Sequence, residues 1–166
     1  MIVSRRFHKF DQHPAHVARV ERDGALVLAD GRLLRLEGIR LALEGPDTLT
    51  SQVLRSLSEL AQSGTVSFTA AAPSRDRYGR LRVQGFGQQW LQVALLEQGL
   101  ARVAMAPDRS ECAPDPYEDE ARGRAKGAGL WALKMFGIRT PEQLKGAAGG
   151  FQIVEGIVSH IGRADG

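Results

Sequence analysis

Arginines recur in this sequence at positions where a planar cation could hold a phosphate group. Two of them lie with Glu44 in the stretch RLEGIRLALEGP, and four more follow in the stretch SRDRYGRLR. The candidate binding arginines are Arg35, Arg40, Arg75, Arg77, Arg80 and Arg82. A guanidinium group presents a rigid fork of N–H donors that matches two oxygens of a phosphate. The pattern predicts a basic, phosphate-binding surface, although such a run of charges is also typical of a solvated hairpin.

Composition narrows the class of protein that could carry this surface. The 166 residues, of which 43% are hydrophobic and 25% charged, suffice for one globular domain with a core. A net charge of +3 favours nucleic acid only if the charge gathers on one face. No apolar run is long enough for a membrane helix, so we expect no membrane partner. The sequence leaves two locations open: the cytoplasm, or outside it if a leader has been removed.

The first half of the chain predicts a strand meander and then a helix. Alternating apolar residues over 14–39 are interrupted by Asp-Gly pairs at 23–24 and 30–31, which are typical hairpin turns. After Pro46 the apolar residues follow a helical period. These residues are Leu49, Val53, Leu54, Leu57 and Leu60.

The second half alternates strands and helices. Strands are predicted from residue 65 and over 80–86, a short helix ends at Gly99, and a short strand covers 101–104. A final helix is predicted to begin at Pro116, capped by Asp115. This order indicates an α+β fold, mainly β, in which a five-stranded OB-fold barrel carries about three helices over residues 14–133. Its predicted core includes Leu36, Ile39, Val53, Leu57, Val66, Leu96 and Leu100.

Four stretches, taken together, resemble a known family. They are RLEGI from Arg35, DRYGR from Asp76, LEQGLARV from Leu96, and the segment from Glu120 to GLW at Trp131. In this order they resemble the staphylococcal-nuclease-like (thermonuclease) domains. That resemblance implies an OB barrel and calcium-assisted cleavage of a phosphodiester. In the family, two aspartates bind the metal, a glutamate activates water, and two arginines hold the phosphate.

Carried over residue by residue, the resemblance keeps the arginines and loses the acids. The two phosphate arginines correspond to Arg35 and Arg80. The three acidic positions correspond to Ala25, Arg40 and Leu43. A guanidinium about 4 Å from a divalent cation would be repelled by about 8 kcal/mol at an effective dielectric of 20, as an upper bound. We therefore expect no metal ligands, no bound calcium and no other cofactor.

Three functional hypotheses follow. The first is a nuclease-like domain without calcium-dependent catalysis that binds single-stranded DNA or RNA, or another phosphate-rich partner. In it, Arg35 and Arg80 lie close together with Arg40 nearby, and an anion or acidic side chain lies between them. The second is an active phosphodiesterase in which Glu44, or an acid such as Asp23 or Asp47, replaces the missing base. The third is a protein-interaction scaffold whose arginines pair with internal carboxylates such as Glu37 or Asp76.

The ends of the chain differ in composition from its centre. Residues 1–13 read as a polar tail, and 134–150 as a linker rich in glycine and alanine. Residues 151–166 are predicted to add a strand, over 151–161, that begins a truncated C-terminal segment. Because an exposed apolar strand edge promotes association, we expect this strand to pair with the barrel edge, a protein partner or a second copy.

Overall fold

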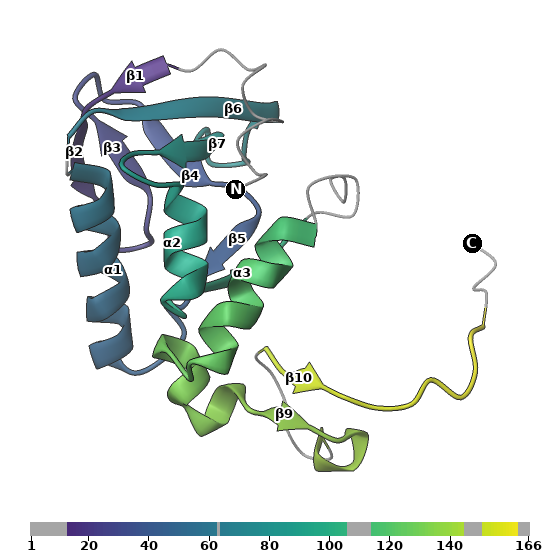
Figure 1. Cartoon of the computed structure of the whole chain (residues 1–166). Helices are drawn as coiled ribbons and strands as arrows, with labels where there is room; N and C mark the ends of the chain where they lie inside the picture. The colour runs from purple at the N-terminus through teal and green to yellow at the C-terminus, as the bar shows by residue number, and fades with distance from the viewer. Residues whose placement is uncertain (1–12, 63, 106–113, 145–150, 163–166) are drawn as a thin grey trace.

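The computed structural model describes residues 13–62, 64–105, 114–144 and 151–162, and it confirms the α+β class. Figure 1 shows three helices packed beside a curved sheet. The strands are β1 (His13–Ala15), β2 (Val17–Val20), β3 (Leu26–Leu28), β4 (Leu33–Leu36), β5 (Ile39–Leu41), β6 (Val66–Arg75), β7 (Leu81–Phe86), β8 (Ala101–Val103), β9 (Ile138–Arg139) and β10 (Ile153–Val154). The helices are α1 (Asp47–Gln62), α2 (Leu91–Glu97) and α3 (Pro114–Ala125), with 3-10 turns at Gly129–Ala132, Lys134–Phe136 and Pro141–Leu144.

Strand pairing within the described residues gives an open six-stranded sheet in place of the predicted closed barrel of five strands. Its order is β1-β6-β7-β4-β3-β2, and β5 pairs separately with β8. The β4–β7 pair is parallel, whereas the other pairs in this sheet are antiparallel. The predicted count differs because the first strand bends at His16 into two pieces that pair with different neighbours.

The predicted meander and its turns are confirmed. β2, β3 and β4 follow one another as antiparallel neighbours. Gly24 adopts φ +79°, a left-handed conformation that glycine reaches without strain, and its N–H donates to Glu21 O at 2.9 Å. Asp23 Oδ1 accepts from the backbone N–H of Ala25 at 3.1 Å. The Asp-Gly pair therefore both reverses the chain and aims the Asp23 carboxylate outward from the turn.

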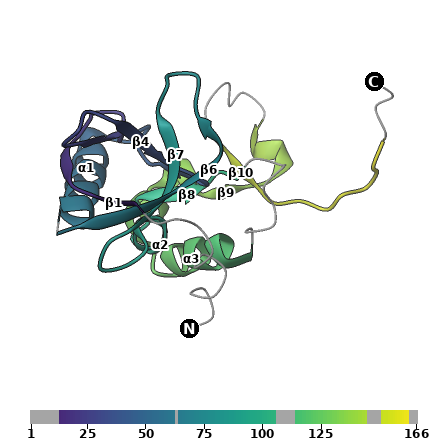
Figure 2. The same ribbon diagram turned by 90° about the horizontal axis from the view of Figure 1, so that it is seen from above.

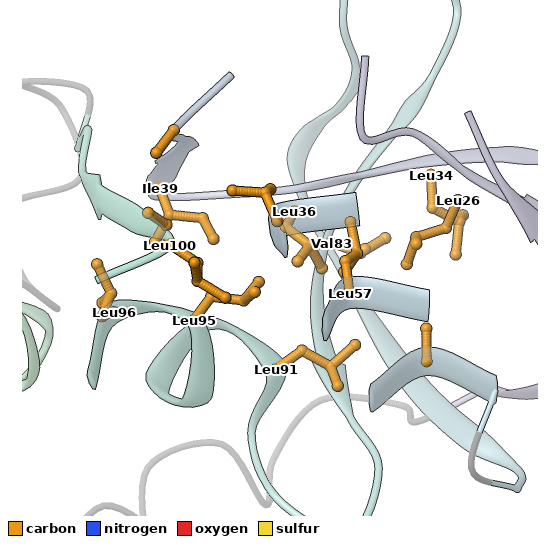
Figure 3. Close-up of a cluster of buried hydrophobic side chains, with 14 of the residues drawn as sticks. Leu26, Leu34, Leu36, Ile39, Leu57, Val83, Leu91, Leu95, Leu96 and Leu100 are labelled. Carbon is orange, nitrogen blue, oxygen red and sulfur yellow. The ribbon is translucent and has the colours of Figure 1, made fainter. Parts of the chain in front are cut away.

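The core lies between the sheet and the helices. All seven core residues predicted from the sequence are buried, with Val53, Leu57, Val66, Leu96 and Leu100 fully so. Helix α1 packs against β2 and α2. The face that it buries carries Leu49, Val53, Leu57 and Ala61. Figure 3 shows Leu57, Val83 and Leu36 meeting at the centre of this core. Truncating one such leucine to alanine costs about 2–5 kcal/mol of stability.

Helix α2 is the most buried helix, and α3 packs along it. The last predicted helix is present but begins at Pro114, so Asp115 lies inside its first turn and not before it. None of the helices in the described ranges is both long and apolar enough to cross a membrane.

The C-terminal strand is much shorter than predicted over 151–161. Only Ile153–Val154 forms a strand, and it pairs in parallel with β9 and not with an edge of the main sheet. The last bond of this ladder runs from Glu155 N to Arg139 O, and Pro141, which has no N–H, follows soon after β9. Residues 157–162 run away from the body in both views (Figures 1 and 2), and Ile157 is 99% exposed.

The structure describes parts of the predicted tail and linker. His13 belongs to β1, whereas the rest of the predicted tail, 1–12, lies outside the described residues. The predicted linker holds two 3-10 turns and β9, and its glycine-rich part, 145–150, is likewise outside the description.

Candidate phosphate-binding surface

Asp76 organises the turn between β6 and β7. Its Oδ1 accepts from the backbone N–H groups of Tyr78 at 2.9 Å and Arg80 at 3.0 Å. Its Oδ2 accepts from Arg80 Nε at 2.7 Å. Gly79 supplies the left-handed residue of the turn. The DRYGR stretch is therefore a turn in which one carboxylate satisfies two backbone donors and a buried cation.

The electrostatics of Asp76 reflect these contacts. Burial alone raises the pKa of this carboxyl group, because it disfavours the charged form. Hydrogen bonds from the Arg80 side chain and from the N–H groups of Arg80 and Tyr78 lower the pKa by more, so it lies below its usual value. Asp76 is therefore ionised and bound to its partners at neutral pH.

Arg80 connects two turns that are far apart in the sequence. Its Nη1 donates to Asp23 Oδ2 at 2.5 Å, and its side chain is only 11% exposed. Asp23 comes from the β2–β3 turn and Asp76 from the β6–β7 turn, so Arg80 joins the ends of two hairpins. The guanidinium fork is thus occupied by carboxylates, which is the arrangement that the scaffold hypothesis expects.

Arg35 and Arg80 lie close together, as the first hypothesis predicts, and they meet at Asp76, an internal carboxylate that the scaffold hypothesis names. Arg35 Nη1 is 3.9 Å from Asp76 Oδ2, the same oxygen that Arg80 Nε contacts. The group between the two arginines is therefore the acidic side chain of Asp76. Arg35 differs from Arg80 in that 50% of its side chain is exposed.

Arg35 and Arg40 open into the same concave surface. Two adjoining hollows share Arg35, Leu36, Ile39 and Arg40 in their walls, and we call them the arginine hollows. Asp23 and Glu44 are among the other residues that line the first hollow, and Asp76 and Arg82 are among those that line the second. The Arg40 side chain is 55% exposed. These two arginines, and not Arg35 with Arg80, present their cations to solvent.

Arg82 is held by Glu37 in a fork-to-fork pair. Its Nε donates to Glu37 Oε2 at 2.7 Å, and its Nη2 donates to Glu37 Oε1. Behind this pair, the buried Gln92 amide donates to Glu37 O at 3.3 Å and Val83 O at 3.0 Å. Because Arg82 stands opposite Arg35 in the β4–β7 register, the pair forms one rigid wall of the second hollow.

The remaining predicted arginines sit at the exposed β6–β7 turn. Arg75 Nη1 donates to Gly79 O at 2.6 Å, which secures the turn. The guanidinium groups of Arg77 and Arg80 lie 4.8 and 5.0 Å from the centre of the Tyr78 ring. Such contacts are typical of cation–π pairs. Arg75 and Arg77 thus add positive charge beside the arginine hollows without lining them.

Arg102 belongs to this surface although it was not among the candidate residues. The β5–β8 register places it directly opposite Arg40, and its Nη2 donates to Glu44 Oε2 at 3.3 Å. Burial lowers the pKa of Arg102; the carboxylate of Glu44 raises it and the charge of Arg40 lowers it, leaving it below its usual value. Nothing local in the sequence marks this residue, because only the pairing of β5 with β8 brings it here.

The residues around the hollows do not fit a calcium site. Ala25 is buried, and Arg40 and Leu43 line the first hollow, so none of the three family acid positions supplies an oxygen. The nearest carboxylates, those of Asp23, Asp76 and Glu44, each pair with at least one arginine. Within the described ranges, no three or more His, Cys, Asp or Glu side chains gather as metal ligands.

Neither comparison with known proteins identifies the chain: no family model matches it, and no curated protein matches its sequence. The charge of the surface is then the main guide to the ligand that it could bind. Arg35, Arg40, Arg80, Arg82 and Arg102 face four carboxylates, those of Asp23, Glu37, Glu44 and Asp76. The network thus has an excess of positive charge, and that excess is most accessible at Arg35 and Arg40.

Proposed function

We propose that this domain binds single-stranded nucleic acid through its phosphate backbone, with Arg35 and Arg40 as the phosphate ligands. The observation that carries the proposal is that these two half-exposed arginines line the same pair of hollows. Two guanidinium groups on one concave surface suit the spaced negative charges of a single strand. Arg80 then acts as a positioning residue, because its buried fork holds Asp76 and Asp23 in place.

The proposal includes a nuclease-like, OB-type barrel as the finer description of the fold. The support is the connection between the two edge strands of the main sheet. β1 and β2 lie at opposite edges in the pairing order but are separated in the chain by His16 alone. A sheet whose two edges meet across one residue must curl strongly, as the strands of a partly open OB barrel do.

The proposed activity is binding without calcium-dependent cleavage. A general base needs an oxygen that can accept a proton from water. Each carboxylate oxygen of Glu44 accepts from a guanidinium group, Oε1 from Arg40 and Oε2 from Arg102, which ties this side chain to the two arginines. The alternative, a phosphodiesterase that uses Glu44, predicts cleavage of a labelled oligonucleotide that the E44Q variant loses. Cleavage by the parent that calcium stimulates would contradict our proposal.

The decisive binding experiment is a salt series with matched variants. The R35A/R40A variant should bind a fluorescent single-stranded oligonucleotide more weakly than the parent in an anisotropy titration. The slope of log affinity against log salt should become shallower by about 1.4 for two lost phosphate contacts. The control R32A/R55A removes the same charge from two exposed arginines that do not line the hollows, and it should keep most of the slope.

A protein-interaction scaffold is the second candidate function. The partly buried pairs Arg80–Asp76 and Arg82–Glu37 favour it, because these arginines have carboxylate partners within the domain. This candidate predicts no measurable oligonucleotide binding by the parent even at low salt. It also predicts equal behaviour of R35A/R40A and R32A/R55A, so the same titration separates the two functions.

A further inference from the structure

Two arginines face each other directly across the β5–β8 pair. Arg40 on β5 is in register with Arg102 on β8. Like charges directly opposite one another in an antiparallel pair repel and destabilise it. An anion held between the two cations offsets this repulsion. Arg40 lines both hollows, and Arg102 stands opposite it on β8, so the pair can hold an anion at this edge of the arginine hollows.

In this structure the anion is the carboxylate of Glu44. Its Oε1 accepts from Arg40 Nη2 and its Oε2 from Arg102 Nη2 at 3.3 Å. Glu44 lies in the segment between β5 and α1, and it lines the first arginine hollow together with Arg35. Its side chain is 38% exposed, so it can turn into solvent without a change in the core.

Arg102 is held more firmly than Arg40. Only 10% of its side chain is exposed, and its guanidinium carbon lies 3.5 Å from the centre of the Phe151 ring. The aromatic ring comes from the segment that leads into β10, so the C-terminal part of the chain buttresses the site. Arg102 is thus a fixed cation, whereas Arg40 and Glu44 are its two exposed partners.

We propose that Arg40 and Arg102 form a second phosphate subsite that Glu44 occupies until a phosphate group of the bound strand displaces it. This inference rests on the proposed function, because it assigns the phosphate that Arg40 binds to a site shared with Arg102. Phosphate and carboxylate present similar pairs of oxygens to a guanidinium fork. When a phosphate replaces Glu44, the two arginines stay neutralised and the released carboxylate becomes hydrated. Glu44 thus competes with the ligand and limits its affinity.

The first test removes the competing charge. The E44Q and E44A variants should bind the labelled single-stranded oligonucleotide about fivefold more tightly than the parent, because no carboxylate has to be displaced. The control D30N also removes one negative charge, from the exposed Asp30–Arg32 pair in the turn between β3 and β4. Asparagine there can still accept the hydrogen bond from Arg32 N that Asp30 receives. D30N should therefore shift affinity much less than E44Q, above all at high salt, where distant charges are screened.

The second test probes the subsite without nucleic acid. Sodium phosphate, compared with sodium chloride at equal ionic strength, should raise the melting temperature of E44Q more than that of the parent, since ligand binding stabilises the folded state. Two results would overturn the subsite. One is that E44Q and D30N bind the oligonucleotide with equal affinity. The other is that phosphate raises the melting temperatures of E44Q and the parent equally. Failure of the proposed function gives a different result: the parent does not bind the oligonucleotide, but phosphate still stabilises E44Q.

Discussion

Single carboxylates decide which arginines of this surface can meet a ligand. Arg35 and Arg80 both contact Asp76 Oδ2, yet only Arg80 is also bound by Asp23 and buried. A buried cation that loses its partner is costly, so Arg80 stays with its carboxylates. Arg35 keeps one long contact at 3.9 Å and remains available. The same type of residue therefore serves structure at one position and binding at another.

Replacing Asp76 tests its structural role. D76N should lower the free energy of unfolding at pH 7 by about 1–3 kcal/mol, because asparagine can accept the backbone N–H groups but leaves the Arg80 cation without its main charge partner. Urea unfolding followed by circular dichroism measures the change. The control D30N, in an exposed Asp-Gly turn, should change stability much less. Equal losses in the two variants would contradict a special role for Asp76.

The pH dependence of stability follows from the same residue. The folded-state pKa of Asp76 is lowered below its ordinary value of 3.8, so the unfolded chain binds a proton more readily than the folded one. The stabilisation is therefore complete above pH 3.8 and is lost as the pH falls through the lowered folded pKa. Urea unfolding between pH 6 and pH 2.5 should show a difference between parent and D76N that shrinks in acid. A difference that does not change with pH would refute this linkage.

At the scale of elements, the junction between α2 and the 3-10 turn at Gly129–Ala132 depends on close backbone contact. Gly99 adopts φ +63°, and a Cβ built there would lie 2.0 Å from the carbonyl oxygen of Ala128. Its own carbonyl accepts from Leu130 N at 2.8 Å. Because β8 begins at Ala101, two residues after Gly99, this junction also positions Arg102.

Substitution at this junction should be much more damaging than at an open turn. G99A combines a left-handed backbone with a steric clash, so we expect a loss of about 3 kcal/mol or more. G31A is the matched control: Gly31 has φ +84° but nothing within 4 Å of a built Cβ, so only the backbone cost of about 1 kcal/mol remains. Thermal unfolding of both variants gives the comparison. Equal destabilisation would show that the contact with Ala128 contributes nothing.

At the scale of the whole molecule, the chain divides into a packed body and an extended C-terminal segment. The body buries its apolar side chains between the sheet and the helices, as Figure 3 shows for its centre. Beyond β10 the large apolar residues Ile157, Val158 and Ile161 are exposed. Contacts with the body are made earlier, where Phe151 packs on Arg102.

Removing the end of this segment should leave the body intact. Deletion of residues 156–166 should change the melting temperature by no more than about 1 °C, because the described part of this segment buries little apolar surface. L57A, which empties a fully buried site, should lower stability by about 2–5 kcal/mol. Differential scanning calorimetry measures both. A large loss on deletion would mean that the segment packs on the body in solution.

Local patterns in the sequence were sufficient to predict the turns, the helix α1 and the core. Asp-Gly pairs favour hairpin turns wherever they occur, and the spacing of Leu49, Val53 and Leu57 selects one helix face. These signals act between residues a few positions apart. The six candidate arginines were also visible as a pattern, because their residue type alone indicates anion chemistry.

Only the tertiary structure decided which of those arginines are paired and which face the hollows. The Arg80–Asp23 and Arg82–Glu37 contacts join residues 57 and 45 positions apart, and the Arg40–Arg102 register depends on how β5 meets β8. Strand pairing also decided the extent of β10, since apolar alternation forms a strand only where a partner edge is present. Charge pairing and strand register act through space, so residue types along the chain could not specify them.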